Sequence, residues 1–177
     1  MSGGPIGAGT GKLAIWVGGD RKVFDLYAEV LESMGDRIQY IGSIGAGTIA
    51  KLAHNMASLA INCVIAEVLT MGVKTGLEPS VLWEAIRSGA AGRSRMFDNV
   101  GRRFLRGRLH PPSFQLRLAY KDAQLALQVG REASVPMKLC SLAALDMTEA
   151  MNRSWGARDT QSVLLLKPNA PSFRRSR

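Results

Sequence analysis

The sequence predicts a mainly α-helical chain, in which an all-helical domain follows a short β-α-β fragment. From residue 44 onward, apolar residues recur at helical spacing between glycine and proline breakers. Before that point, two short apolar runs of strand type flank one amphipathic helical stretch. The 177 residues are 46% hydrophobic and 21% charged, a composition typical of a folded globular protein. We therefore divide the chain into the fragment, 1–43, the helical domain, 44–168, and a basic tail, 169–177, which we expect to be disordered.

The β-α-β fragment begins with a strand predicted over residues 12–17, an apolar run that is closed by two glycines. Asp20 follows as the predicted N-cap of a helix over 21–33, because its side chain can accept hydrogen bonds from the first free backbone N–H groups. Gly35 ends this helix, and a second short strand covers 38–41. Two strands make no stable sheet by themselves, so we expect further strands from a preceding segment or from a partner chain. The inward side of the helix is predicted to consist of Val23, Phe24, Tyr27, Val30 and Leu31.

The helical domain starts with a long helix, which Gly76 ends as a residue suited to the left-handed turn after a helix. Pro79 opens the next helix at its first turn, and Pro136 precedes a later one. The predicted helices cover residues 45–74, 80–87, 94–104, 116–132, the stretch between Pro136 and residue 152, and 159–166.

A glycine-rich turn leads into the long helix, and residues 45–50 fit the G-x-G-x-x-A pattern of dinucleotide-binding sites. That pattern indicates a nucleotide site only when a second strand follows the helix and ends in an acidic residue about 20 positions on. Here the next acidic residue is Glu67, which lies inside the continuing helical pattern. We therefore interpret Gly45 and Gly47 as residues that let a helix and a strand pack closely.

The long helix carries a lysine and an asparagine, Lys51 and Asn55, four residues apart in otherwise apolar sequence. Residues at this spacing lie on the same face of a helix. An ammonium and an amide side by side can hold an oxygen of a small substrate and exchange a proton with it. The pair is therefore the first candidate for a catalytic site.

The chain is strongly basic, with 23 Lys and Arg against 14 Asp and Glu, and a formal net charge of +9. Such a balance suits anionic ligands, nucleic acid included. Few aromatic residues stand between the clustered arginines and no nucleic-acid-binding motif is present, so we favour a solvated basic face over nucleic-acid binding. The clustered arginines are Arg93, Arg95, Arg102, Arg103, Arg106 and Arg108, with Arg174, Arg175 and Arg177 at the end of the chain.

The sequence gives little support for a metal site, a disulfide or a membrane-spanning segment. Cys63 and Cys140 fall on apolar helical stretches without metal-ligand spacing, so we expect reduced core residues and no metal site. The longest apolar stretch, 49–73, is interrupted by charged and amide side chains and is not predicted to span a membrane. The first residues show no signal-peptide pattern, so we expect a cytoplasmic location.

Three segments together carry a family resemblance. They are Ser2-Gly3-Gly4 with the glycines and strand that follow, Gly42-x-x-Gly-x-Gly-x-x-x-Lys51-x-x-x-Asn55, and Lys121-Asp122-x-x-Leu-Ala. In this order and at this spacing they resemble the substrate-binding, catalytic and cofactor-side motifs of the 3-hydroxyisobutyrate dehydrogenase family, also called β-hydroxyacid dehydrogenases. The resemblance extends from Ser2 to about residue 167.

The resemblance implies that the chain corresponds to the C-terminal part of such an enzyme. The helical domain would then be similar to the C-terminal domain of 6-phosphogluconate dehydrogenase, and the β-α-β fragment would be the last piece of a Rossmann domain. In this family the dinucleotide fingerprint lies upstream of the serine-glycine-glycine segment. We therefore expect these residues alone to form an incomplete NAD or NADP site.

The resemblance also implies roles for individual residues. Lys51 matches the catalytic lysine, which exchanges a proton with the substrate oxygen, and Asn55 matches the asparagine that hydrogen-bonds the substrate beside it. Ser2, Gly3 and Gly4 match the segment that holds the substrate carboxylate.

On the cofactor side, Lys121 matches the lysine that reaches the dinucleotide, and Asp122 is its structural neighbour. The implied activity is an NAD(P)-dependent interconversion of a small 3-hydroxy carboxylate and its oxo or semialdehyde form, with 3-hydroxyisobutyrate and tartronate semialdehyde among the candidates. The family also implies a homo-oligomer formed through the helical domain. The alternative is a non-catalytic module derived from this family, which serves oligomerisation or binds anions or nucleic acid.

Overall fold

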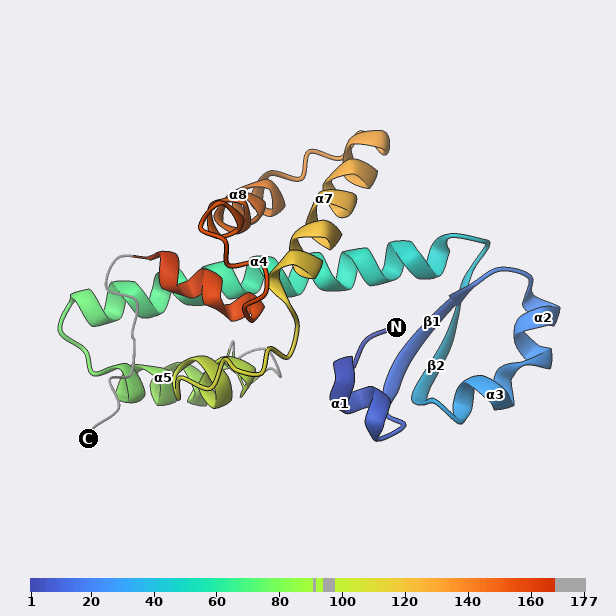
Figure 1. Cartoon of the computed structure of the whole chain (residues 1–177), viewed down its shortest axis with the longest axis horizontal. Coiled ribbons are helices and arrows are strands. Elements are labelled where there is room, and N and C mark those ends of the chain that lie inside the picture. Colours follow the sequence, from blue (N-terminus) through green and yellow to red (C-terminus); the bar gives the residue numbers. More distant parts are fainter. Residues whose placement is uncertain (91, 94–97, 168–177) are drawn as a thin grey trace. The chain divides into compact units, whose positions relative to one another are not determined.

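The computed structural model describes residues 1–90, 92–93 and 98–167, and the predicted tail over 169–177 lies outside them. The chain forms two compact units, one from Met1 to Met56 and one that begins at Ala57. The first unit holds a small parallel sheet with short helices, and the described part of the second is helical (Figure 1). The expected mainly α fold is confirmed at this level.

The sheet of the first unit has two parallel strands, β1 (Leu13–Gly18) and β2 (Gly35–Gly42), which are paired with Ile15 opposite Ile38. The predicted β-α-β arrangement is therefore confirmed. Strand β1 has six residues, as predicted, and β2 has eight where four were predicted. A further helix, α1 (Gly4–Gly9), precedes β1 and was not predicted. Its three glycines lower the helix propensity, which hides the helix in the sequence, although the proline in its first turn is a start signal.

The connection between the strands holds two short helices, α2 (Arg21–Leu26) and α3 (Ala28–Glu32), where one continuous helix was predicted. The predicted inward side of this helix is wrong in three positions, because Val23, Tyr27 and Val30 are more than half exposed. A sheet of two strands is too narrow to cover a whole helix face.

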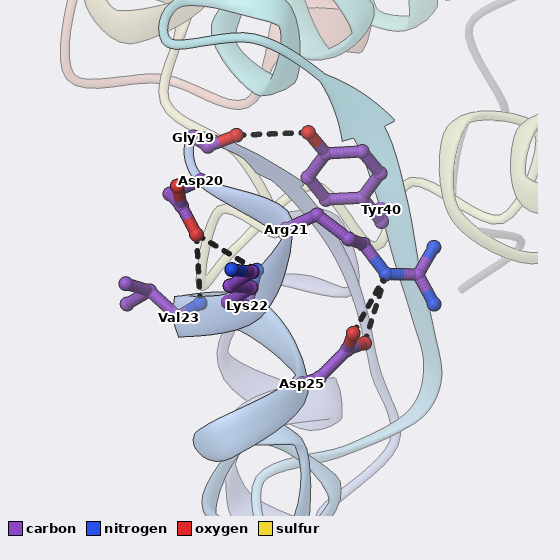
Figure 2. A network of polar contacts seen from close by, with 7 residues as sticks. All are labelled: Gly19, Asp20, Arg21, Lys22, Val23, Asp25 and Tyr40. Atoms are coloured by element: carbon purple, nitrogen blue, oxygen red, sulfur yellow. Dashed lines mark hydrogen bonds and ion pairs between the residues drawn. The ribbon is translucent and has the colours of Figure 1, made fainter.

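Asp20 caps α2 as predicted (Figure 2). Its carboxylate accepts hydrogen bonds from the backbone N–H groups of Lys22, at 2.8 Å, and Val23, at 3.1 Å. The hydroxyl of Tyr40 on β2 donates to the carbonyl oxygen of Gly19 at 2.8 Å. These contacts tie the end of β1 to both the following helix and the neighbouring strand.

The long helix α4 (Ala46–Lys74) is confirmed, and Gly76 follows it with a φ of +94°, as expected of a residue beyond a helix end. The helix starts against the end of β1. A Cβ on Gly47 would lie 2.5 Å from the carbonyl oxygen of Trp16, and a Cβ on Gly18 would come equally close to the turn before α4. The glycine-rich turn thus serves close helix–strand packing, and no strand follows α4 among the described residues.

By length and composition, α4 is also the one described helix that could cross a membrane. Within the protein, 44% of its most apolar window is buried. Leu69 is fully buried and Ile65 is 1% exposed, whereas Val64 and Met71 are 59% and 63% exposed, so one side of α4 packs into the core and another side is exposed.

The core of the second unit forms where α4 meets α5 (Pro79–Ser88) and the π-helical turn η1 (Val100–Phe104). The helix start at Pro79 is confirmed, and η1 is the described end of the helix predicted over 94–104, whose residues 94–97 lie outside the description. The buried members of this core are Ile65, Ala66, Leu69, Trp83, Val100, Phe104, Leu105 and Leu164.

Three elements complete the second unit: α7 (Leu116–Glu132), α8 (Lys138–Asn152) and the 3₁₀ helix η2 (Thr160–Leu166). All three match predicted helical stretches. Helices α7 and α8 follow each other in the chain and pack against each other, and η2 contacts both.

A fully buried carboxylate, Asp159, joins distant parts of this unit. It accepts hydrogen bonds from the backbone N–H of Ser113 at 2.7 Å, the hydroxyl of Ser113 at 2.8 Å and the N–H of Gln161 at 3.0 Å. The guanidinium of Arg103 lies 3.1 Å away and forms an ion pair. Asp159 therefore caps η2 and fixes the loop before α7 at the same time.

Candidate active site

Lys51 and Asn55 stand in the first half of α4, within the first unit. Their spacing places them on one face of the helix, as predicted, and both residues are half-buried. A long cationic side chain and a short amide are thus presented together from one rigid element.

The Ser2-Gly3-Gly4 segment is anchored to the sheet of the same unit. The backbone of Ser2 exchanges two hydrogen bonds of 2.8 Å with Ala14 on β1. Gly3 has a φ of +136°, and a Cβ there would lie 2.9 Å from the side chain of Leu13. Glycine is therefore required at this position for the chain to turn beside β1.

His54 connects this segment to α4. Its Nε2 lies 3.3 Å from the hydroxyl of Ser2, and its ring lies 5.2 Å from that of Trp16, at a tilt of 53°. Partial burial lowers the pKa of His54, which favours the neutral imidazole at pH 7. Sequence reasoning did not single out this contact, because its partners are 52 residues apart and no local pattern links them.

Lys51 also lies within electrostatic range of the same segment. Burial, and then the positive charge of Lys51, lower the pKa of the amino group of Met1. The structure thus gathers the predicted substrate-binding segment and the predicted catalytic helix within one unit.

Lys121 and Asp122 belong to α7 in the second unit, and their geometry is described within that unit alone. The ammonium of Lys121 lies 2.8 Å from the carboxylate of Asp122. The lysine side chain is 58% exposed, whereas that of the aspartate is 3% exposed. The buried carboxylate can therefore orient a lysine that remains accessible to an anionic ligand.

The basic cluster divides into anchored and exposed arginines. Arg103 pairs with Asp159 and donates to the carbonyl oxygen of Pro111 at 2.7 Å, so its role is structural. Arg102, Arg106 and Arg108 are exposed. Arg95, which was counted in the same cluster, lies outside the described residues.

Metal and thiol chemistry gain no support from the described residues, where no three His, Cys, Asp or Glu side chains gather into a possible metal site. Both cysteines are free, with Cys63 buried as expected and Cys140 only half-buried. Burial raises the pKa of Cys63 to about 12, with a smaller contribution from Asp146, so this thiol stays protonated at neutral pH.

Two sequence profiles of known families match the chain. The profile described as the NAD-binding region of NADP-dependent 3-hydroxyisobutyrate dehydrogenase matches residues 45–166. The profile of the NAD-binding domain of 6-phosphogluconate dehydrogenase matches residues 1–42.

Individual relatives give the same result. A 2-(hydroxymethyl)glutarate dehydrogenase from Eubacterium barkeri is 32% identical over 164 residues, which cover 93% of this chain and 54% of that protein. A 3-hydroxyisobutyrate dehydrogenase from Pseudomonas aeruginosa is 35% identical over 144 residues, which cover 77% of this chain and 48% of the relative.

Among solved structures, Mycobacterium tuberculosis 3-hydroxyisobutyrate dehydrogenase with L-serine superposes with a TM-score of 0.80 at 26% identity, over 93% of this chain and 58% of that one. The chain thus spans about half the length of the curated relatives it matches.

Proposed function

The chain belongs to the 3-hydroxyisobutyrate dehydrogenase family, and from this membership we propose that it acts within an NAD(P)-dependent oxidoreductase for a small 3-hydroxy carboxylate. Two relatives are named for 3-hydroxyisobutyrate and 2-(hydroxymethyl)glutarate, both of which carry a hydroxyl group on the carbon β to a carboxylate. The proposed reaction interconverts such an acid and its oxo or semialdehyde form. The cytoplasmic location expected from the sequence stays a prediction.

Two contacts within the first unit support this proposal: His54, the neighbour of Asn55 on α4, lies 3.3 Å from the Ser2 hydroxyl, and burial and then the charge of Lys51 lower the pKa of the Met1 amino group. Backbone N–H groups and the Ser2 hydroxyl can bind a carboxylate where the glycines admit close approach. The substrate hydroxyl would then reach the helix face, where Asn55 donates a hydrogen bond to its oxygen.

Lys51 is the proposed acid–base group. In the oxidation direction it accepts the hydroxyl proton as the C–H bond at the same carbon breaks, and in the reduction direction it returns that proton to the oxygen. Hydride transfer would be the chemistry supplied by a bound nicotinamide, while the protein positions and polarises the substrate. His54 contributes by holding Ser2 in place against α4.

The described residues fit part of a dinucleotide site. Lys121, exposed and oriented by Asp122, offers a cation suited to a phosphate or ribose group. The glycine-rich turn before α4 lacks the strand that completes a dinucleotide-binding unit, because no strand follows α4 among the described residues. We propose that the phosphate-binding turn comes from another segment or another chain.

The test is an assay of the protein purified from its natural host, after its intact mass has been measured. Oxidation of 3-hydroxyisobutyrate and 2-(hydroxymethyl)glutarate, and reduction of tartronate semialdehyde, would be followed by nicotinamide absorbance with NAD and NADP. The proposal predicts turnover of at least one substrate with one cofactor. The absence of turnover with every combination in a folded protein that binds NAD or NADP would contradict it.

A further inference from the structure

A tryptophan stands among arginines in the turn that joins α8 to η2. The guanidinium carbon of Arg158 lies 4.6 Å from the centre of the Trp155 ring, and that of Arg153 lies 5.5 Å from it. Cations at such distances are attracted to the π-electrons, so the ring restrains both guanidinium groups. Trp155 is only half-buried, in contrast to Trp83 in the core, and both arginines are exposed. The arrangement therefore belongs to the surface of the second unit.

A third arginine, Arg117 at the start of α7, lies beside this turn. Its backbone N–H donates to the carbonyl oxygen of Gly156 at 2.9 Å, and the N–H of Leu116 donates to the carbonyl oxygen of Arg158 at 2.8 Å. The Arg117 side chain is exposed, and its Nε–H donates to the side-chain oxygen of Gln115 at 2.9 Å. Backbone pairing between distant segments thus gathers three arginines beside one tryptophan.

The positive charge of this surface is only partly neutralised. Glu149 forms an ion pair with Arg153 at 2.5 Å. Within residues 1–90, 92–93 and 98–167, no carboxylate forms an ion pair with Arg117 or Arg158. Two cations are therefore available to an anionic ligand, and each is restrained, one by a ring and one by an amide. Such restraint lowers the entropy that a long side chain loses on binding.

The chemistry of this surface is typical of proteins that bind single-stranded nucleic acid. Such proteins pair arginine with phosphate groups and stack unpaired bases on aromatic rings or on guanidinium planes. The arginines between residues 93 and 108 have few aromatic residues among them, which argued against this function. Here, by contrast, an aromatic ring contacts two of the three arginines.

From these observations we infer that the surface formed by Arg117, Arg153, Trp155 and Arg158 binds single-stranded nucleic acid. Phosphates of the strand pair with Arg117 and Arg158, and a base stacks on the guanidinium that lies over Trp155. An acidic peptide would offer carboxylates to the arginines but no base to the stack, and a duplex would keep its bases paired. The inference concerns this surface only and does not depend on the proposed hydride transfer.

The first experiment measures the binding of a labelled oligo-uridine of about twelve nucleotides to the full chain by fluorescence anisotropy, at several salt concentrations. The inference predicts a dissociation constant of about 10⁻⁶–10⁻⁴ M that rises with salt. Arg158→Gln and Arg117→Gln should each weaken binding about fivefold at roughly 0.1 M salt, because each removes one phosphate contact. Each should also lower the slope of log affinity against log salt by about 0.7.

Arg131→Gln is the matched control for the loss of charge. Arg131 is also exposed on α7 but lies near the other end of that helix. Its replacement should change the dissociation constant by less than about twofold. Polyglutamate of equal length serves as the competitor without bases and should displace the labelled strand at least about tenfold less effectively than unlabelled oligo-uridine.

The second experiment follows the tryptophan ring directly. Oligo-uridine should change the tryptophan fluorescence of the chain, whereas a duplex of equal length should not, because its bases are already stacked. Trp155→Phe should abolish the change, since Trp83 is buried in the core and Trp16 belongs to the first unit. Far-UV circular dichroism checks that each variant keeps its fold.

Four results would overturn the inference. They are the absence of binding at low salt, a loss for Arg131→Gln as large as that for Arg158→Gln, displacement by polyglutamate as effective as by oligo-uridine, and displacement by excess NADP. The third would assign the surface to an acidic peptide, and the fourth would assign its arginines to the dinucleotide site proposed around Lys121. An inactive protein that binds the strand as predicted would contradict the proposed function and leave this inference intact.

Discussion

The buried carboxylate of Asp159 should be the most sensitive polar group in the second unit. Replacing it with alanine leaves the Arg103 guanidinium, 22% exposed, without its ionic partner and removes the acceptor for Ser113 and for the first turn of η2. Loss of one partner from a buried ion pair costs about 3–5 kcal/mol, and the partial exposure of Arg103 favours the lower end. Loss of the helix cap, about 1 kcal/mol, overlaps with this cost and adds little to it.

Asp159→Ala should therefore lower the free energy of unfolding by about 3 kcal/mol. In a urea titration followed by far-UV circular dichroism, this corresponds to a midpoint lower by roughly 1.5 M. Glu67→Ala is the control, since its carboxylate is 64% exposed and its ion pair with Lys167 is 3.3 Å long, so the change should stay below about 1 kcal/mol. A loss below about 1 kcal/mol for Asp159→Ala would refute the view that this carboxylate fixes the loop and η2.

Three further changes test other parts of the account. Gly47→Ala should lower the free energy of unfolding, measured by urea titration, by about 2 kcal/mol, because the new methyl would lie 2.5 Å from a backbone oxygen of β1. Gly9→Ala is the control: the space around Gly9 is open, so this change should lower the free energy of unfolding by less than about 0.5 kcal/mol. Ellman's reagent at pH 8 should label Cys140 on α8 in the native protein but Cys63 only after denaturation, because a pKa of about 12 leaves Cys63 almost no thiolate. Equal labelling rates for the two cysteines in the native protein would contradict this expectation. His54→Ala should raise the KM for the hydroxy acid about tenfold with a smaller fall in kcat, because the change removes the contact with Ser2 but does not alter the reacting groups. An unchanged KM would contradict a role of His54 in substrate binding.

The long helices could be predicted from the sequence because their signals are local. Apolar residues at helical spacing predicted α4, α5, α7 and α8, and the boundary residues Gly76, Pro79 and Pro136 helped to place the helix ends to within a few residues. The helix α1 was missed because glycine lowers the very propensity on which such a prediction depends. The inward face assigned to residues 21–33 was wrong, since burial depends on how much sheet lies beside a helix and not on its own pattern.

Within the candidate site, too, some features could be predicted from the sequence and others could not. Lys51 and Asn55 could be found from a spacing of four residues, and a family resemblance supplied Ser2, Lys121 and their roles. The contact between Ser2 and His54 joins residues 52 positions apart, and those of Asp159 span 46 and 56 positions. Such contacts form only when the strands and helices have assembled, so no local sequence pattern predicts them.

The central claim is that Lys51 exchanges the proton in an NAD(P)-dependent reaction of a small hydroxy acid. The most direct measurement compares kcat of the natural protein with that of Lys51→Ala, introduced into its gene in the host, with the preferred substrate and cofactor. Lys74→Ala, at the exposed end of the same helix, is the control and should leave kcat unchanged. The account predicts a loss of about 10²–10⁴-fold in kcat with little change in folding, as expected for removal of an acid–base group. A Lys51→Ala protein that retains kcat within about tenfold would contradict the account.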